Sequence, residues 1–294
     1  MSAAPLIDRA FLEKLERLTL RWRKSFPGLV GGHNTSRFPG PGQEFFDHRH
    51  FHYGDDLRAV NWRAYLRLEK LFLKMFQVEP RVPVRVLLDI SGSMGTGEPS
   101  KFVYARRLAA ALTYVGLVRL DTIYLHPFSS TLGEGMVCSG GRHRFAPVVD
   151  FLTGLEAKDA SHYAPVARQF ASTYVQRGLL VILSDFLDDA GCEKPLQFLA
   201  DCGHELLLIH LWADEDREPP WVGELDLTDA ETGEKLEISF DEGARREYTA
   251  SFDLYARTLQ ELAVRTGGRY IGLSTAVPFE EAIFGPLIHA GGVV

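Results

Sequence analysis

The chain has 294 residues, of which 46% are hydrophobic, 24% charged and 11% aromatic, and its formal net charge is -7. This length suits one or two globular domains, and the composition excludes a disordered, collagen-like or coiled-coil chain. Because the overall charge is negative, no global positive field exists to hold phosphate groups, and nucleic acid is not an expected partner.

The first part of the chain is predicted to be an N-terminal module covering residues 1–80. Residues 6–26 have the apolar spacing of an amphipathic helix, with Leu6, Phe11, Leu15 and Trp22 on one stripe. From residue 28 to 67 the sequence is rich in Gly, His, Arg and aromatic residues and has no long period, so we expect irregular structure there. Residues 71–78 follow as an extended segment.

From Val84 the pattern changes to alternating strands and helices, which predicts a second domain over residues 81–294. Apolar runs typical of buried strands cover residues 84–90, 122–128, 179–185, 205–212 and 269–274, and a short strand is expected around 133–139. Helices are expected at 101–118, 144–154, 163–177, 193–201 and 243–266, and an antiparallel hairpin is inserted at 224–240. We therefore predict an α/β fold with a doubly wound, mostly parallel sheet.

Neither the cysteines nor the apolar runs indicate secretion or membrane insertion. The three cysteines have no CxxC spacing and favour a reducing compartment. The longest apolar run, Leu108–Val118, ends at Arg119, well short of the ~20 residues that cross a bilayer. The sequence predicts a soluble, cytoplasmic protein without a membrane span.

Two strand ends carry the residues that suggest chemistry. The first strand runs into LLDISGSMG, where Asp89, Ser91 and Ser93 are two apart and so point the same way in an extended chain. Asp185 follows another buried strand, directly after Ser184. Carboxylates and hydroxyls are oxygen donors, which suit a hard divalent cation, with Mg²⁺ preferred and Mn²⁺ or Ca²⁺ as alternatives.

The expected topology brings these two strand ends together. In a doubly wound sheet of order 3-2-1-4-5-6, ligands bind at the carboxyl ends of strands 1 and 4, where the order reverses. Counting the short strand near residue 136, the strands that precede Asp89 and Asp185 are the first and the fourth. The sequence therefore predicts one shared site.

The D-x-S-x-S pattern followed by a distant Asp resembles the metal-ion-dependent adhesion site of von Willebrand factor type A domains. These domains are doubly wound, and their third element is usually a Thr before a helix. The best match here is Ser161, which keeps the hydroxyl but lacks the methyl group of Thr. The resemblance implies a metal site formed by Asp89, Ser91, Ser93, Ser161 and Asp185.

The N-terminal segment narrows the resemblance to the Domain of Unknown Function 58 family, over nearly the whole chain. Its R-x-Y-x-x-G-D-D-x-R-x-I-[DN]-W string is matched by Arg49, Gly54, Asp55, Asp56, Arg58, Asn61 and Trp62, with Phe51 and Val60 as replacements. The resemblance implies a bacterial protein that works with a MoxR-type AAA ATPase. We interpret the Gly-Asp-Asp segment as a structural turn and Trp62 as a core residue.

Several functions fit these residues. With two acids, a cation-bound site would be near neutral, and a vacant coordination position could take a carboxylate from a partner protein. This favours a non-enzymatic interaction module. The competing readings are a metal-dependent hydrolase with Asp188, Asp189 or His162 as base, and a scaffold with a vestigial site. A zinc site at His48, His50 and His52 is a weaker hypothesis than exposed strand histidines.

Overall fold

The computed structural model describes residues 6–20, 39–40, 44–52, 60–77, 82–289 and 291–292. The chain divides into two units, a larger one formed by residues 1–24 and 83–294 and a smaller one formed by residues 25–82. The first 24 residues thus belong with the larger unit, whereas the sequence had placed them with the rest of residues 1–80. The physical reason is that the apolar side chains of the described residues 6–20 pack into the core of the larger unit.

The larger unit is built on a six-stranded sheet of order β11-β8-β7-β4-β5-β6. When the six strands are numbered along the chain, this is the predicted order 3-2-1-4-5-6, and the doubly wound, mostly parallel α/β fold is confirmed. All neighbours are parallel except β6, which pairs antiparallel with β5. The strands are β4 (Val84–Asp89), β5 (Ile123–Phe128), β6 (Met136–Cys138), β7 (Leu179–Ser184), β8 (Glu205–Trp212) and β11 (Arg269–Ser274).

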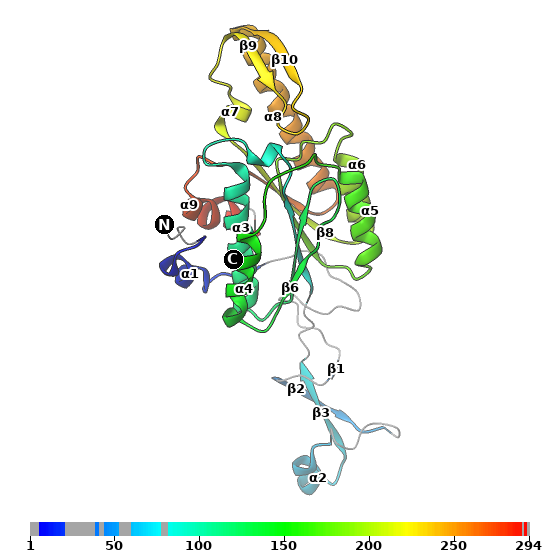
Figure 1. The fold of residues 1–294 in the computed structure, drawn as a ribbon. Helices are drawn as coiled ribbons and strands as arrows, with labels where there is room; N and C mark the ends of the chain where they lie inside the picture. Colours follow the sequence, from blue (N-terminus) through cyan, green and yellow to red (C-terminus); the bar gives the residue numbers. More distant parts are fainter. Residues whose placement is uncertain are drawn as a thin grey trace. The chain divides into compact units, whose positions relative to one another are not determined.

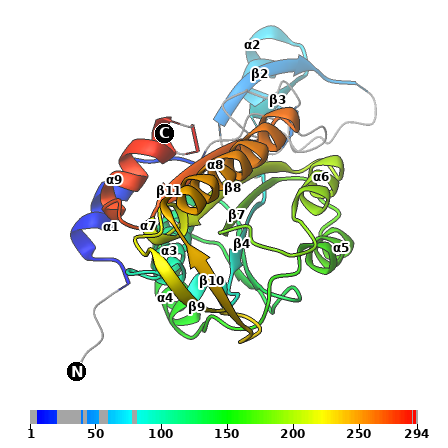
Figure 2. The same ribbon diagram turned by 90° about the horizontal axis from the view of Figure 1, so that it is seen from above.

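Helices cover both faces of this sheet (Figures 1 and 2). Along β4, Val84, Val86 and Leu88 face one hydrophobic core and Leu87 the other, as the alternation of a strand requires. The first core is completed by α1 (Arg9–Leu15), α3 (Lys101–Val118), α4 (Phe145–Thr153) and α9 (Phe279–Ala282). The second is completed by α5 (Tyr163–Thr173), α6 (Glu193–Asp201) and α8 (Glu242–Arg265).

Helix α1 is held in the larger unit by aromatic packing. Asp8 caps it by accepting a hydrogen bond from the Phe11 N–H. The Phe11 ring is 2% exposed and packs edge-on against Phe279, with centroids 5.2 Å apart. The helix ends at Leu15, much earlier than the predicted residue 26, although Leu18 and Leu20 remain buried. Trp22 lies outside the described residues.

The predicted hairpin is present as β9 (Gly223–Thr228) and β10 (Lys235–Phe240), paired antiparallel. It follows the short helix α7 (Asp214–Arg217) and leads into α8, whose first turn is capped by the Asp241 carboxylate. Most of the hairpin is exposed, and Phe240 at its base is buried.

The smaller unit contains a three-stranded antiparallel sheet, β1 (Pro39–Gly40), β3 (Phe72–Gln77) and β2 (Glu44–His50). Strand β3 confirms the extended segment predicted over 71–78, whereas β1 and β2 lie where irregular structure was expected. Asn61 caps α2 (Trp62–Leu68) by accepting from the Ala64 N–H. Trp62 is 54% exposed, so its interpretation as a core residue is wrong. Gly54, Asp55, Asp56 and Arg58 lie outside the described residues, as does the side chain of Arg49.

Two further findings concern membrane spans and clusters of metal-ligating side chains among the described residues. None of their helices combines the length and the apolar character needed to cross a bilayer. They also contain no group of three or more His, Cys, Asp or Glu side chains placed to hold a metal ion. Of the three alternating histidines, the ring of His50 lies against Phe72, and the side chain of His48 is outside the described part of the chain.

Candidate metal centre

The candidate site lies at the carboxyl ends of β4 and β7, which are neighbours at the point where the strand order reverses. The two strands pair in register up to Leu88 and Leu183, so the next residues, Asp89 and Ser184, stand side by side. Both segments leave the sheet at this point. The topology therefore places the side chains that follow the two strands around one small volume.

Asp89 is the centre of the arrangement. Its side chain is fully buried and accepts three sets of hydrogen bonds, from the Ser91 N–H (2.9 Å), the Ser161 hydroxyl (3.1 and 3.2 Å) and the Ser184 hydroxyl (2.5 Å). Each of these donors is neutral. The structure thus brings Ser161, the least regular element of the predicted motif, directly to the carboxylate of the first Asp.

The loop after β4 presents its two serines together. The hydroxyls of Ser91 and Ser93 are 3.0 Å apart, and Ser91 is fully buried. The Gly92 N–H donates to the carbonyl of Asp159 over 2.8 Å, which ties this loop to the segment that carries Ser161. Oxygen atoms from the two loops therefore lie close together.

Ser184 and Tyr163 are parts of the site that the sequence analysis did not identify. While Ser184 donates to Asp89, its oxygen accepts from the Tyr163 hydroxyl (2.6 Å) and the Phe186 N–H (2.7 Å). These two donors fix the direction of the Ser184 proton toward the carboxylate. The only sequence signal was the position of Ser184, one residue before Asp185 at the end of a buried strand.

Asp185 is almost fully buried and its charge is balanced by a lysine. The ammonium group of Lys101, the first residue of α3, lies 2.9 Å from Asp185 and 2.9 Å from Asp216 of α7. The Lys101 side chain is only 2% exposed. Burial works to lower its pKa, but the two carboxylates outweigh burial and the pKa of Lys101 is raised. Lys101 therefore stays charged.

The electrostatics of Asp89 are different, because no basic group contacts it among the described residues. Burial raises the pKa of Asp89 to about 7, and repulsion from Asp185 adds to the rise, while the hydrogen bonds from Ser184 and Ser91 oppose it. Near neutral pH this carboxyl is thus poised between its acid and its ionised form. A cation placed between the two acids would favour the ionised form.

These residues fit a hard divalent cation. The donor set consists of carboxylate and hydroxyl oxygens, without the sulfur or imidazole ligands that zinc and copper prefer. A buried carboxylate with neutral partners is costly when ionised, and a bound cation would remove that cost. The residues that could hold it are the five that the sequence indicated, Asp89, Ser91, Ser93, Ser161 and Asp185.

A comparison with protein families places the chain. The family model described as "Protein of unknown function DUF58" matches residues 47–255, which is more than half of the chain and includes all five residues. The chain belongs to the DUF58 family.

The relatives of this DUF58 protein include the uncharacterized protein Rv1480 of Mycobacterium tuberculosis, which is 27% identical over 82% of this chain and 77% of its own length. Among solved structures, the hypothetical protein BatB of Bacteroides thetaiotaomicron aligns with a TM-score of 0.44 at 18% identity, over 71% of this chain and 98% of BatB. The SpRpn10 VWA domain aligns with a TM-score of 0.34 at 13% identity, over 69% of this chain and 94% of that domain.

Asp188, Asp189 and His162, the residues considered as a hydrolytic base in this DUF58 protein, do not contact the Asp89 carboxylate in the described residues. The Asp188 carboxylate accepts from the Tyr163 and Ala190 N–H groups and so holds the start of α5. Asp189 and His162 are exposed. None of the three makes a described contact with the carboxylate of Asp89.

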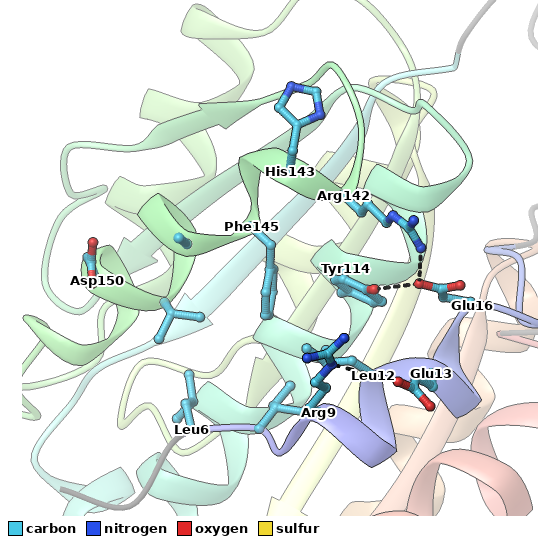
Figure 3. A pocket seen from close by; sticks show the side chains of 13 residues that line it. Leu6, Arg9, Leu12, Glu13, Glu16, Tyr114, Arg142, His143, Phe145 and Asp150 are labelled. Atoms are coloured by element: carbon cyan, nitrogen blue, oxygen red, sulfur yellow. Dashed lines mark hydrogen bonds and ion pairs between the residues drawn. The ribbon is translucent and has the colours of Figure 1, made fainter. Parts of the chain in front are cut away.

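A surface pocket of about 840 Å³ occurs elsewhere in the larger unit, between α1, α3 and α4 (Figure 3). There the Glu16 carboxylate accepts from Arg142 (2.7 Å) and the Tyr114 hydroxyl (2.9 Å). Because β6 runs antiparallel to β5, with Cys138 opposite Ile123, the segment containing Arg142 starts at the amino ends of the parallel strands. The pocket is thus remote from the candidate site.

Proposed function

We propose that this protein is a cation-dependent protein-interaction module. One observation carries the proposal, namely the fully buried Asp89 carboxylate whose partners are all neutral donors. Such a group is expected either to stay protonated or to hold a cation. The hydroxyls of Ser91, Ser93 and Ser161 and the second acid, Asp185, give the oxygen environment that Mg²⁺ requires.

The cation would supply Lewis acidity at a protein surface. The chain's own residues hold the ligand oxygens in place, with Ser184 orienting the Asp89 carboxylate and Lys101 balancing the charge of Asp185. A coordination position not filled by these residues would then accept a carboxylate oxygen from another protein. The partner chemistry is therefore an acidic side chain on a protein surface.

We propose a MoxR-type AAA ATPase, or a client protein delivered to it, as the partner that supplies this acidic side chain. What supports this choice is membership of the DUF58 family, because the resemblance to that family implies a protein that works with such an ATPase. The negative net charge of -7 offers no general attraction for an acidic partner, so recognition would depend on the cation itself.

The test measures Mg²⁺ binding by calorimetry and pull-down of the MoxR-type ATPase. Asp89→Ala should abolish both, while Asp189→Ala, an exposed carboxylate nearby, should leave both unchanged. Ser93→Ala is a milder variant, because it removes one hydroxyl at a partly exposed position. Retention of both activities in Asp89→Ala and Ser93→Ala would refute the proposal.

A metal-dependent hydrolase is the second candidate, and the same variants distinguish it. Generic phosphoesters and peptides would be screened with Mg²⁺ and Mn²⁺. Turnover that is present in the native protein and lost in Asp89→Ala would show that the site is catalytic, and the hydrolase would replace the interaction module as the proposed function. A protein that binds neither cation would instead fit the scaffold with a vestigial site.

A further inference from the structure

The tip of the β9–β10 hairpin lies directly on the loop that carries Ser91 and Ser93. A methyl group built on Gly92, in the middle of this loop, would lie 2.7 Å from the carbonyl oxygen of Ala230 and 3.5 Å from the Cα of Glu231. Any larger side chain at Gly92 would therefore collide with the hairpin backbone. The close approach joins two segments that are far apart in the sequence.

Glu231, at this tip, directs its carboxyl into the same site. Its Oε1 atom is buried and has no hydrogen-bond partner, although the residue sits in an otherwise exposed turn. Burial raises the pKa of Glu231 and repulsion from Asp185 adds to the rise, while the nearby Ser93 and the Ser161 backbone oppose it. The groups that act on Glu231 are thus the proposed cation ligands.

The turn is built to present this side chain. The Asp229 carboxylate accepts from the N–H groups of Glu231 (2.8 Å) and Thr232 (2.6 Å), which fixes the chain in an Asx-type turn. Gly233 follows with φ of 74°, a conformation in which other residues are strained. The backbone around Glu231 is therefore ordered independently of the site below it.

The rest of the hairpin is weakly held. Leu227 on β9 and Leu236 on β10 are 41% and 61% exposed, so the two strands bury little apolar surface. The buried anchor is Phe240, at the base where β10 meets α8. A hairpin that is anchored at its base and rests on the site through its tip can move away with a small loss of packing.

We propose that Glu231 is an internal ligand, which occupies the coordination position of the cation that a partner carboxylate takes on binding. This inference rests on the proposed function and adds a way in which binding of the partner is regulated. The hairpin keeps the site closed in the free protein, because an attached carboxylate competes at a high effective concentration. A partner must then displace Glu231, so binding and hairpin movement are coupled.

The test uses Mn²⁺ as the probe and water-proton relaxation as the readout, which reports the number of water molecules on the bound ion. Glu231→Gln should raise that number by about one, because water fills the released position. The matched control, Glu234→Gln, changes an exposed carboxylate three residues away on the same hairpin and should leave the relaxation unchanged.

The outcomes separate this inference from the proposed function. If the native protein binds Mn²⁺, and Asp89→Asn does not, the site exists whatever the hairpin does. Equal relaxation in the native protein and Glu231→Gln would then overturn the internal ligand alone, as would an equal rise in Glu234→Gln. If the native protein binds no Mn²⁺, the proposed function and this inference both fail.

Discussion

Replacing Asp89 with Asn is expected to stabilise the metal-free protein while it removes Mg²⁺ binding. The carboxyl has a pKa of 3.8 in an unfolded chain and about 7 in the folded one. Between these values the folded protein keeps a proton that the unfolded chain releases, so the contribution of Asp89 to stability falls as the pH rises. Asn has nearly the same shape and never ionises.

The magnitude follows from the two pKa values. Full ionisation of Asp89 costs the folded state about 4 kcal/mol above pH 7, and about 2 kcal/mol of this is already present near pH 5. The amide of Asn is a poorer partner for Ser184 and Ser161, which removes about 1–2 kcal/mol. Asp89→Asn should therefore gain about 2–3 kcal/mol near pH 8 and almost nothing near pH 5.

The assay is urea unfolding in EDTA at both pH values, with the native protein and the variant measured together. A second buried group also titrates, because burial lowers the pKa of His210 to about 3 and its contribution is lost as the pH falls below 6.5. His210 is common to both proteins, so its effect cancels in the difference. A variant that is less stable than the native protein at pH 8, or a difference independent of pH, would refute the reasoning.

Three other variants test the surroundings of the site and the packing of α1 by urea unfolding in EDTA. Ser184→Ala leaves the buried Tyr163 hydroxyl without its acceptor and should cost about 2–3 kcal/mol, whereas the exposed Ser172→Ala should be neutral. Lys101→Met leaves Asp185 without its cation and should lower the free energy of unfolding by about 3–5 kcal/mol. When Mg²⁺ replaces EDTA, part of this loss should be restored, and an unchanged stability would count against a shared site. Phe11→Ala should cost about 3–5 kcal/mol, and an unchanged midpoint would contradict the packing of α1 in the larger unit.

The sheet could be predicted from the sequence because its strands are buried on both faces. A strand such as β7 reads as an uninterrupted apolar run, Leu179–Leu183, which is typical of the centre of a parallel sheet. The alternation of strands and helices predicted a doubly wound sheet, and the order 3-2-1-4-5-6 was taken from such sheets in general. The N-terminal region was harder, because α1 spans seven residues and its place depends on contacts with Phe279, far along the chain.

The candidate site was predictable where its residues are close in sequence or end a strand. The spacing of Asp89, Ser91 and Ser93 was sufficient to indicate that their side chains point the same way. Asp185 was recognisable by its position after β7. Lys101 and Glu231 gave no such signal, since a lysine at the start of a helix and a glutamate in a turn are usually solvated. Only the fold shows that Lys101, from α3, and Glu231, from the turn between β9 and β10, both lie near Asp185.

The assignment of residues 1–24 to the larger unit makes the smaller unit an insertion rather than a terminal domain. A methyl group on Gly116 would lie 3.4 Å from Leu20 and 2.4 Å from Ile123, the residue paired with Val84. Leu20, the last described residue before the smaller unit, and Val84, the first residue of β4, therefore lie near the same part of the larger unit. A short Gly-Ser bridge could replace residues 25–82, and such a minimal protein would show which partner contacts belong to the excised segment.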